Sequence, residues 1–242
     1  MLCYHAISDT WDDPLATSAE VFERQLNMLV RRGYTAVGGE GALANRARTL
    51  CVTFDDAFRS VGSVLGTLER LGIPVTIFAC TELAESGGPF RVPELSRRLP
   101  ADEDELLTMS WDTLGELAQR GVQIGSHTAS HPHLPQLGDD ELEAELTSSR
   151  ELVEARIGQR CGLLAYPYGH HDARVRTAAH KAGYTGAFTV GPPTGASSPY
   201  AFPRVGVYRR DNNIRFMLKT SRSRHIMTAA RTRARVIAGA GR

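Results

Sequence analysis

The sequence predicts an α/β fold in which crossover helices connect the strands of a parallel sheet. Short apolar runs alternate along the chain with segments whose apolar residues recur at helical spacing. A glycine follows most of the helical segments, as is common at helix C-termini. Polar and ionisable residues come directly after four predicted strands. In a parallel α/β barrel such strand ends share one face, where the active site lies.

Size and composition are those of an ordinary globular chain. Of its 242 residues, 42% are hydrophobic and 23% charged, and the net charge of +1 points to no class of partner. Barrels of this length are often one domain. No apolar run reaches the roughly 18 residues of a membrane span and no signal peptide precedes the first strand, so the expected location is cytoplasmic. We expect buried, reduced thiols at the four unpaired cysteines, which are Cys3, Cys51, Cys80 and Cys161.

The predicted elements of the first half begin with a short strand and a capped helix. A capping box at residues 17–20 opens that helix and Gly33 closes it. A further helix ends at Gly72, and residues 40–47 are expected to form a helical turn. The predicted strands are residues 1–5, 34–37, 50–54 and 73–78.

The second half begins with an irregular excursion over residues 81–108, which contains Gly87, Gly88, Pro89 and Pro93. Regular alternation then resumes. The predicted helices are residues 110–120, 139–157 and 173–182, and the predicted strands are residues 122–125, 161–165 and 184–189.

Two adjacent carboxylates, Asp55 and Asp56, follow the predicted strand 50–54. Neighbouring strand residues point to opposite faces, so the two acids are expected to serve different roles unless the backbone turns sharply there. One role is metal binding or proton transfer. The alternative is that Asp56 caps the following helix.

Two histidines, His127 and His131, follow the predicted strand 122–125 at a spacing of four residues. On a helical turn both imidazoles would face the same side. Together with one carboxylate they would form a two-histidine, one-acid set suited to zinc or another borderline divalent ion. The alternative is a pair of surface or capping residues. His133 follows Pro132 and is expected to lie outside the ligand set.

Three segments carry a resemblance to a known family. They are Thr-Phe-Asp-Asp-Ala at 53–57, Ser-His-Thr-Ala-Ser-His at 126–131, and Tyr-Pro-Tyr-Gly at 166–169. Their order and spacing resemble the first three motifs of the polysaccharide deacetylases, the NodB-homology group or carbohydrate esterase family four. The resemblance runs from about residue 5 to residue 207. It implies a distorted (β/α) barrel of the NodB type and hydrolysis of an N-acetyl group on a sugar.

The resemblance also implies residue roles. Asp56, His127 and His131 would hold one divalent metal, with Zn²⁺ expected and Ni²⁺, Co²⁺ or Fe²⁺ as alternatives, and Asp55 would be the catalytic base. The backbone N–H of Tyr168 would stabilise the oxyanion, while Pro167 and Gly169 fix its loop. Taken alone, the Tyr-Pro-Tyr-Gly segment could equally be a simple turn.

The chain departs from the family pattern in two places. The third motif of the family usually has an arginine that pairs with the catalytic aspartate, which corresponds to Asp55. Ala165 stands at that position here, and Arg204 is a candidate replacement. The late Leu-x-His motif that usually supplies the general acid is absent. His5 is the candidate for this role, because the Tyr-His pair at residues 4–5 resembles a circularly permuted branch of the family. The alternative is an ordinary histidine at a strand end.

Aromatic residues near the motifs could form a platform for sugar rings. Trp11, Phe90 and Tyr168 are the candidates, although Trp11 and Phe90 could equally be packing residues. Asp172 is expected to cap the helix that follows His170 and His171.

The C-terminal segment is basic and contains no acidic residue from Lys219 onward. We therefore divide the chain into a barrel at 1–218 and a basic tail or helix at 219–242. A solvated tail is expected, with peripheral contact to a membrane as the alternative. No nucleic-acid recognition motif accompanies the charge, so nucleic acid is not an expected partner.

The sequence thus predicts a metal-dependent N-deacetylase acting on a poly-, oligo- or glycolipid-linked saccharide. Two alternatives remain open. One is a catalytically weak sugar-binding module on the same fold, and the other is a hydrolase of a different amide or of an O-acetyl ester. The motifs do not indicate the saccharide or the oligomeric state.

Overall fold

The computed structural model describes residues 1–44, 48–95, 100–101, 103–191 and 198–221. The chain divides into two compact units, Met1–Arg209 and Arg210–Arg242. The first unit contains the barrel, and in the second the described residues include helix α8 (Asn213–Thr220). Most of the predicted basic tail, from Arg222 onward, lies outside the described residues.

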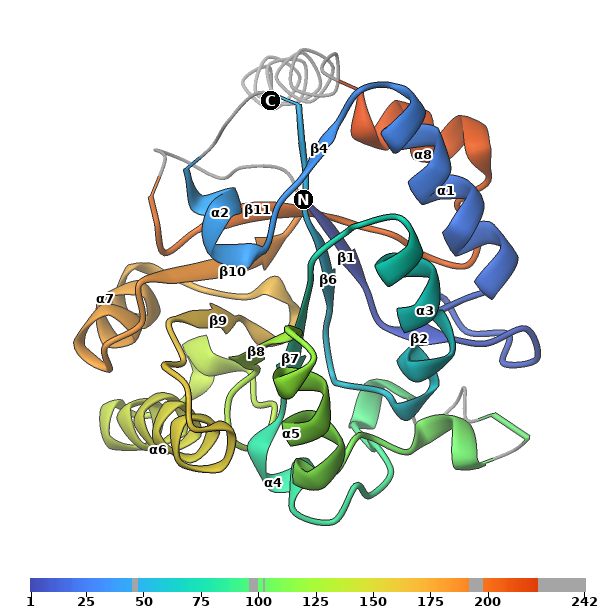
Figure 1. Cartoon of the computed structure of the whole chain (residues 1–242). Coiled ribbons are helices and arrows are strands. Elements are labelled where there is room, and N and C mark those ends of the chain that lie inside the picture. The colour runs from blue at the N-terminus through green and yellow to red at the C-terminus, as the bar shows by residue number, and fades with distance from the viewer. Residues whose placement is uncertain (45–47, 96–99, 102, 192–197, 222–242) are drawn as a thin grey trace, which may run out of the picture. The chain divides into compact units, whose positions relative to one another are not determined.

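Seven parallel strands form the predicted barrel, and the barrel is closed (Figure 1). In spatial order they are β1 (Leu2–Tyr4), β11 (Phe202–Gly206), β10 (Gly186–Val190), β9 (Leu163–Ala165), β8 (Gln123–Ser126), β7 (Val75–Ala79) and β6 (Val52–Phe54). The first strand closes the ring, because Leu2 pairs with Val52 of β6 on one side and with Val205 of β11 on the other. The two ends of the barrel sequence therefore meet at β1.

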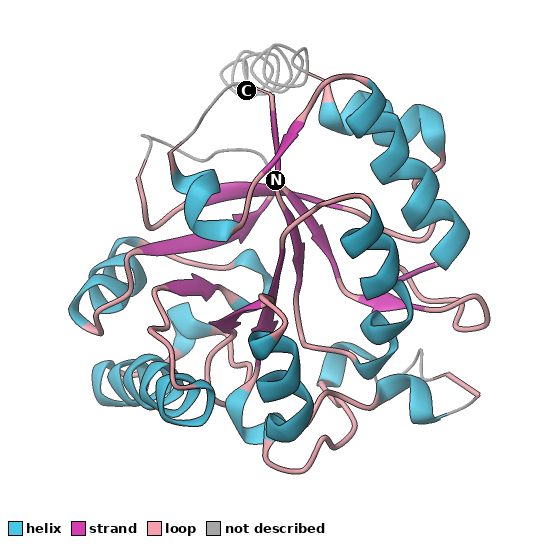
Figure 2. Cartoon of the chain, viewed as in Figure 1, coloured by secondary structure: helices cyan, strands magenta, loops and turns pink. Residues whose placement is uncertain are grey.

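Helices surround these strands on the outside (Figure 2), as crossover connections in a parallel barrel require. They are α1 (Ala19–Arg31), α2 (Gly39–Leu43), α3 (Gly62–Arg70), α4 (Thr81–Ala84), α5 (Trp111–Gln119), α6 (Asp139–Ile157) and α7 (Ala173–Lys181). Side-chain caps form at Ser18, Ser110 and Asp172, each accepting a backbone N–H three residues on. The expected cap of α7 at Asp172 is confirmed, whereas α1 is capped by Ser18 and not by Thr17, the first residue of the predicted capping box.

Two small parallel sheets lie apart from the barrel sheet: β2 (Ala6–Ile7) with β3 (Ala16–Thr17), and β4 (Thr35–Ala36) with β5 (Thr49–Leu50). The predicted strand 34–37 thus pairs outside the barrel. The predicted strand 50–54 divides between β5 and β6 at Cys51. The excursion over 81–108 contains α4 and two 3₁₀ helices, η2 (Pro93–Leu95) and η3 (Glu103–Leu106). Further 3₁₀ turns are η1 (Arg59–Val61), η4 (Leu134–Gln136) and η5 (Pro167–Gly169).

An apolar cluster of residues from neighbouring barrel strands forms part of the core. Phe78, Leu163, Ala165 and Phe188 are all buried in it. Gly125 on β8 faces this cluster, and a Cβ there would lie 2.6 Å from the ring of Phe78. Glycine at this position therefore allows Phe78 to pack directly against the β8 backbone.

All four cysteines are free and buried, as the sequence predicts. Among the described residues, no helix is long and apolar enough to span a membrane.

Candidate metal centre and active site

The candidate site residues converge at the carboxyl end of the barrel strands. His5 follows β1, Asp55 and Asp56 follow β6, and His127 follows β8. The Tyr-Pro-Tyr-Gly segment follows β9 and forms η5. Parallel strands bring these ends to one face, which is the arrangement that the sequence predicts.

Unusual backbone conformations cluster on the same loops. Of the six described non-glycine residues with positive φ, five lie here: Asp56 (65°), Ala57 (50°), Thr128 (71°), His131 (65°) and Tyr168 (59°). Such conformations are costly for residues with a Cβ and often mark functional sites. The turn at Asp56 lets both adjacent carboxylates face the same mouth, although consecutive strand residues would diverge.

Residues 127–131 do not form the helical turn on which both imidazoles would face the same side. These residues form a loop with bends rather than a helix. The two imidazoles nevertheless meet, with ring centroids 4.9 Å apart, because Thr128 and His131 adopt left-handed conformations. The threonine side chain supports this loop by accepting a hydrogen bond from the His131 backbone N–H at 3.1 Å.

Asp56, His127 and His131 form a compact buried set of metal-ligand atoms. Asp56 Oδ1 lies 3.3 Å from His127 Nε2 and 3.5 Å from His131 Nε2. Ligands bonded to a tetrahedral zinc ion at roughly 2.0–2.2 Å are about 3.3–3.6 Å apart, so these separations fit. Asp56 Oδ1 is also buried with no hydrogen-bond partner among the described residues. An unpartnered buried carboxylate oxygen is costly unless a cation occupies the site.

Neighbouring groups determine the tautomer of His127 and shift the pKa values of the two imidazoles in opposite directions. His127 Nδ1 lies 2.7 Å from the carbonyl oxygen of Ala165 and donates its proton there, which leaves a lone pair on Nε2. Burial lowers the pKa of His131 to about 4, so that its ring is neutral at physiological pH. Burial also opposes protonation of His127, but the carboxylates of Asp55 and Asp56 outweigh it and raise its pKa.

Glu145 on α6 fixes the loop that carries His131. One carboxylate oxygen accepts the backbone N–H groups of Ala129 at 2.9 Å and Ser130 at 3.1 Å, and the other accepts the Ser130 hydroxyl at 2.5 Å. The sequence analysis missed this residue. It stands among several acids of one helix, and nothing in that pattern distinguishes it.

Asp55 forms a bidentate ion pair with Arg204 of β11. Arg204 Nη1 lies 2.6 Å from Oδ1 and Nη2 lies 2.7 Å from Oδ2. Nη1 also donates to the hydroxyl of Thr53, and the guanidinium carbon lies 5.3 Å from the ring centroid of Phe78. Arg204 is completely buried. The replacement suggested by the sequence is therefore confirmed as a contact: an arginine reaches Asp55 from β11 instead of from residue 165 on β9.

The charge of Arg204 determines the protonation of Asp55. Burial alone would raise the pKa of this carboxyl group, but the guanidinium outweighs burial and holds the pKa well below its usual range. Asp55 is consequently ionised and oriented, as a proton acceptor must be.

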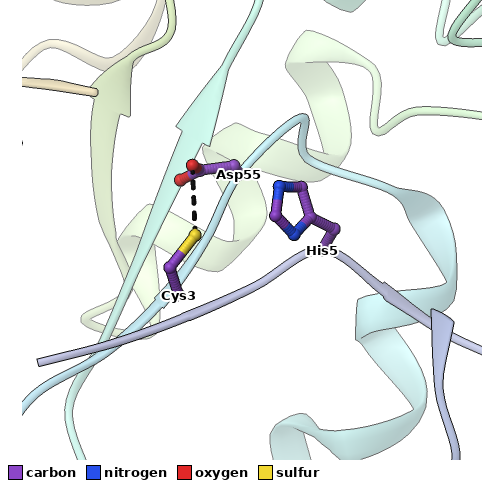
Figure 3. A group of neighbouring side chains, drawn as sticks. All are labelled: Cys3, His5 and Asp55. Carbon is purple, nitrogen blue, oxygen red and sulfur yellow. Dashed lines mark hydrogen bonds between the residues drawn. The ribbon is translucent and has the colours of Figure 1, made fainter. Parts of the chain in front are cut away.

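The side chains of Cys3 on β1 and of His5, which follows β1, approach Asp55 (Figure 3). In the barrel, β1 pairs with β6, which leads to Asp55, and with β11, which carries Arg204. Cys3 Sγ donates to Asp55 Oδ2 at 3.3 Å. A ring nitrogen of His5, the thiol and a carboxylate oxygen of Asp55 all lie within 4.8 Å of one another. His5 Nδ1 is buried without a hydrogen-bond partner among the described residues. The imidazole thus reaches the same mouth as Asp55.

Tyr168 lies at the rim of this mouth, between Pro167 and Gly169 of η5. Its ring contacts His131 edge-on at 4.7 Å, and its hydroxyl donates to Glu94 at 3.0 Å. Gly169 also has a positive φ of 70°, and Thr189 donates to its carbonyl oxygen at 2.6 Å.

Trp11 and Phe90 do not form an exposed platform for sugars. Each is only 2% exposed. Both rings pack edge-on against Phe58, at 5.9 and 5.4 Å, and Phe90 also contacts His131 at 5.1 Å. Trp11 and Phe90 are therefore packing residues, which is the alternative that the sequence left open, and of the three candidates only Tyr168 is partly exposed.

The fold and these residues define a (β/α) barrel with a candidate divalent-metal centre at its carboxyl end. The family model for polysaccharide deacetylases matches residues 43–187, which is more than half of the chain. The chain belongs to the polysaccharide deacetylase family.

Individual relatives agree with this assignment. The Bacillus subtilis (strain 168) polysaccharide deacetylase homologue YxkH is 26% identical over 219 residues, which cover 86% of this chain and 70% of YxkH. The crystal structure of BC0361, a polysaccharide deacetylase from Bacillus cereus, has a TM-score of 0.73 at 25% identity and covers 91% of this chain and 68% of that one. The Streptococcus pyogenes deacetylase PplD, solved with acetate, shares the fold with a TM-score of 0.73 at 22% identity, covering 91% of this chain and 96% of PplD.

Proposed function

We propose that this protein is a metal-dependent hydrolase that removes the N-acetyl group from an amino sugar in a larger saccharide. The observation that supports this most directly is that three candidate metal ligands and an ionised carboxylate lie together at one mouth of the barrel. Asp56, His127 and His131 present three ligand atoms around one point, and Asp55 lies beside them as an ionised carboxylate. Family membership supports deacetylation of a sugar polymer as the reaction class.

Three side chains would hold the metal: Asp56, His127 and His131. When bound there, a divalent ion such as Zn²⁺ supplies Lewis acidity, which brings the pKa of water to about 7 and polarises a carbonyl group. Asp55 is held in place by Arg204 and accepts the proton of the attacking water. The Tyr168 backbone N–H stabilises the oxyanion that forms on the acetamide oxygen.

His5 completes this assignment as the proton donor to the departing amine. Its imidazole reaches the mouth from β1, close to Asp55, and the chain has no late histidine motif to supply the acid. A base and an acid on neighbouring strand ends would allow both proton transfers of amide hydrolysis.

Intact positioning groups favour an enzyme over a weak sugar-binding module. The absence of an arginine at residue 165 is the feature that would suggest lost activity, but Arg204 makes a bidentate contact with the same carboxylate. Sugar binding alone does not require a buried, charged pair such as Asp55 and Arg204 at the mouth of the barrel.

The decisive experiment measures acetate release from a panel of N-acetylated and O-acetylated glycans. We expect release from an N-acetylated substrate, its loss with a chelator, and its recovery with Zn²⁺. The His127→Ala variant should lose both the metal and the activity. The Asp55→Asn variant should retain metal but lose about 10²–10⁴ in rate. Full turnover in the metal-free protein, or release only from O-acetyl esters, would contradict the proposal.

A further inference from the structure

A second pair of imidazoles lies outside the metal triad, on the loops that follow β8 and β9. His133 Nδ1 is 3.4 Å from His170 Nδ1. The two rings are inclined by only 26°, with centroids 5.5 Å apart. Both residues line a surface pocket of about 390 Å³, which Gly169 and His171 also line.

Glu94 determines which nitrogen of His133 carries the proton. His133 Nε2 lies 3.1 Å from Glu94 Oε1, so this nitrogen donates to the carboxylate. Nδ1 of His133 then carries no proton, and its lone pair is directed at His170. A carboxylate behind an imidazole is the arrangement that commonly supports a metal-binding histidine.

The aromatic ring of Tyr168 holds this imidazole in position. The rings of His133 and Tyr168 are stacked, with centroids 4.0 Å apart and an angle of 12°. The Tyr168 hydroxyl donates to the second oxygen of Glu94 at 3.0 Å. His133 is therefore fixed both in orientation and in tautomer, and the conformational cost of binding a ligand is correspondingly small.

The distance between the two Nδ1 atoms suits an ion better than a direct hydrogen bond. At 3.4 Å it exceeds the usual range of about 2.7–3.2 Å for hydrogen bonds of nitrogen donors. It matches the separation of about 3.3–3.4 Å between two nitrogens bonded to one tetrahedral ion at about 2.0–2.1 Å.

We propose that His133 and His170 form a second metal site, which binds a borderline divalent ion such as Zn²⁺, Ni²⁺ or Cu²⁺ with water as the remaining ligands. An ion there links the loop after β8 to the loop that carries Tyr168. The site is separate from the catalytic assignment and does not depend on it.

Zn²⁺ titration by calorimetry, with equilibrium dialysis for stoichiometry, tests this site. We expect the wild-type protein to bind two equivalents in two steps, the tighter at the triad. The His133→Ala and His170→Ala variants should each lose the weaker step and keep the tighter one. Glu94→Ala should weaken that step about 10–100-fold. Mg²⁺ should not replace Zn²⁺, because it prefers oxygen ligands.

His171→Ala is the matched control. His171 lies in the same pocket, but its Nδ1 accepts a hydrogen bond from Arg176 at 3.1 Å, so its loss should leave both steps intact. In the His127→Ala variant, the weaker step should remain when the tighter one is lost. A single equivalent in the wild type, or two steps that survive in His170→Ala, would overturn the second site. If His127→Ala instead kept both steps, the tighter step could not be assigned to the triad, but the second site at His133 and His170 would stand.

Discussion

Two residues of the site, Asp55 and Arg204, are charged although they are buried, where an unpaired charge would be strongly destabilising. Asp55 and Arg204 have side chains only 3% and 0% exposed, and each neutralises the other through two hydrogen bonds. Breaking a buried ion pair by removing one partner costs more than removing both, because a single buried charge is left behind. The pair is thus a structural requirement as well as a means of orienting the base.

The first prediction concerns this ion pair. We expect Arg204→Met to lower the free energy of unfolding by about 3–5 kcal/mol, and the double variant with Asp55→Asn to recover part of the loss. Arg120→Met is the control, because the pair of Arg120 with Glu69 is exposed and should be worth at most about 1 kcal/mol. Denaturant unfolding measures all three variants. An Arg204→Met variant as stable as the wild type would contradict the expectation.

The second prediction concerns His5. Replacing it with alanine should lower kcat by about 10²–10⁴, because the leaving amine would lose its proton donor. Metal affinity should be unchanged, since His5 is not in the triad. His180→Ala, an exposed histidine whose ring is hydrogen-bonded to Tyr200, should leave both quantities as they are. Steady-state kinetics and a metal-competition assay separate the two effects. Loss of metal in His5→Ala would show that the residue has another role.

At the scale of elements, the helices and loops behind the site position the ligands. Residues 127–131 receive support from α6 through Glu145 and from α4, where the N–H groups of Thr81 and Glu82 donate to the Thr128 and Ala129 carbonyls. The conformation of the loop therefore depends on these neighbours as well as on its own Thr128 side chain.

We expect Glu145→Ala to weaken metal binding about 10–100-fold, in line with the loss of other outer supports of metal ligands. The fold should remain intact, because Glu145 is only partly buried. Glu143→Ala changes an exposed acid on the same helix and should have no effect on metal affinity. Competition with a chromophoric chelator measures this difference. Equal metal affinities for the two variants would show that Glu145 does not support the candidate metal ligands.

Gly169 provides a prediction about the loop of Tyr168. Alanine at this position would have to adopt a φ of 70° and would place Cβ 2.7 Å from the backbone nitrogen of Val190. Gly158 has nearly the same φ, 71°, but open space around its Cβ position. Gly158→Ala should therefore cost only about 1–2 kcal/mol of stability, whereas Gly169→Ala should also displace Tyr168 and lower kcat. Thermal unfolding and acetate-release kinetics of the two variants provide the comparison.

Sequence periodicity predicts six of the seven barrel strands and the strand ends where the site lies, but it does not predict β11, which carries Arg204. It failed where tertiary contacts override local preference. Positive φ at Asp56, Thr128 and His131 cannot be read from residues that have a Cβ, since propensity reserves that region mainly for glycine. The burial of Trp11 depends on Phe58, which is distant in sequence, and the role of Glu145 depends on a neighbouring loop.

For the whole molecule, the buried thiols link protonation to stability. Burial raises the pKa of Cys51 to about 11 and that of Cys161 to about 12, and it raises those of Cys3 and Cys80 as well. These folded-state values lie above the value of about 8.5 expected in the unfolded chain. The stabilising contribution is thus fully present below about pH 8.5 and is lost progressively as the pH rises toward the folded-state values.

We therefore expect a thiol reagent such as DTNB to modify none of the four cysteines in the folded protein at pH 8, and all four after denaturation. Thermal stability should fall above about pH 8.5, and Cys161→Ala should reduce the slope of this fall. Rapid labelling of the native protein at pH 8 would show that one of the thiols is accessible.

The position of β1 between β6 and β11 has a consequence for biosynthesis. Arg204 and Asp55 are separated by 149 residues, and β1, which lies between β6 and β11 in the barrel, precedes both of these strands in the chain. β1 and β6 can pair early, but the ring closes only after β11 has been translated. Contacts over such sequence separations form slowly. Asp55 therefore lacks its guanidinium partner while the 149 residues up to Arg204 are translated, and the ion pair can form only when β11 joins the barrel.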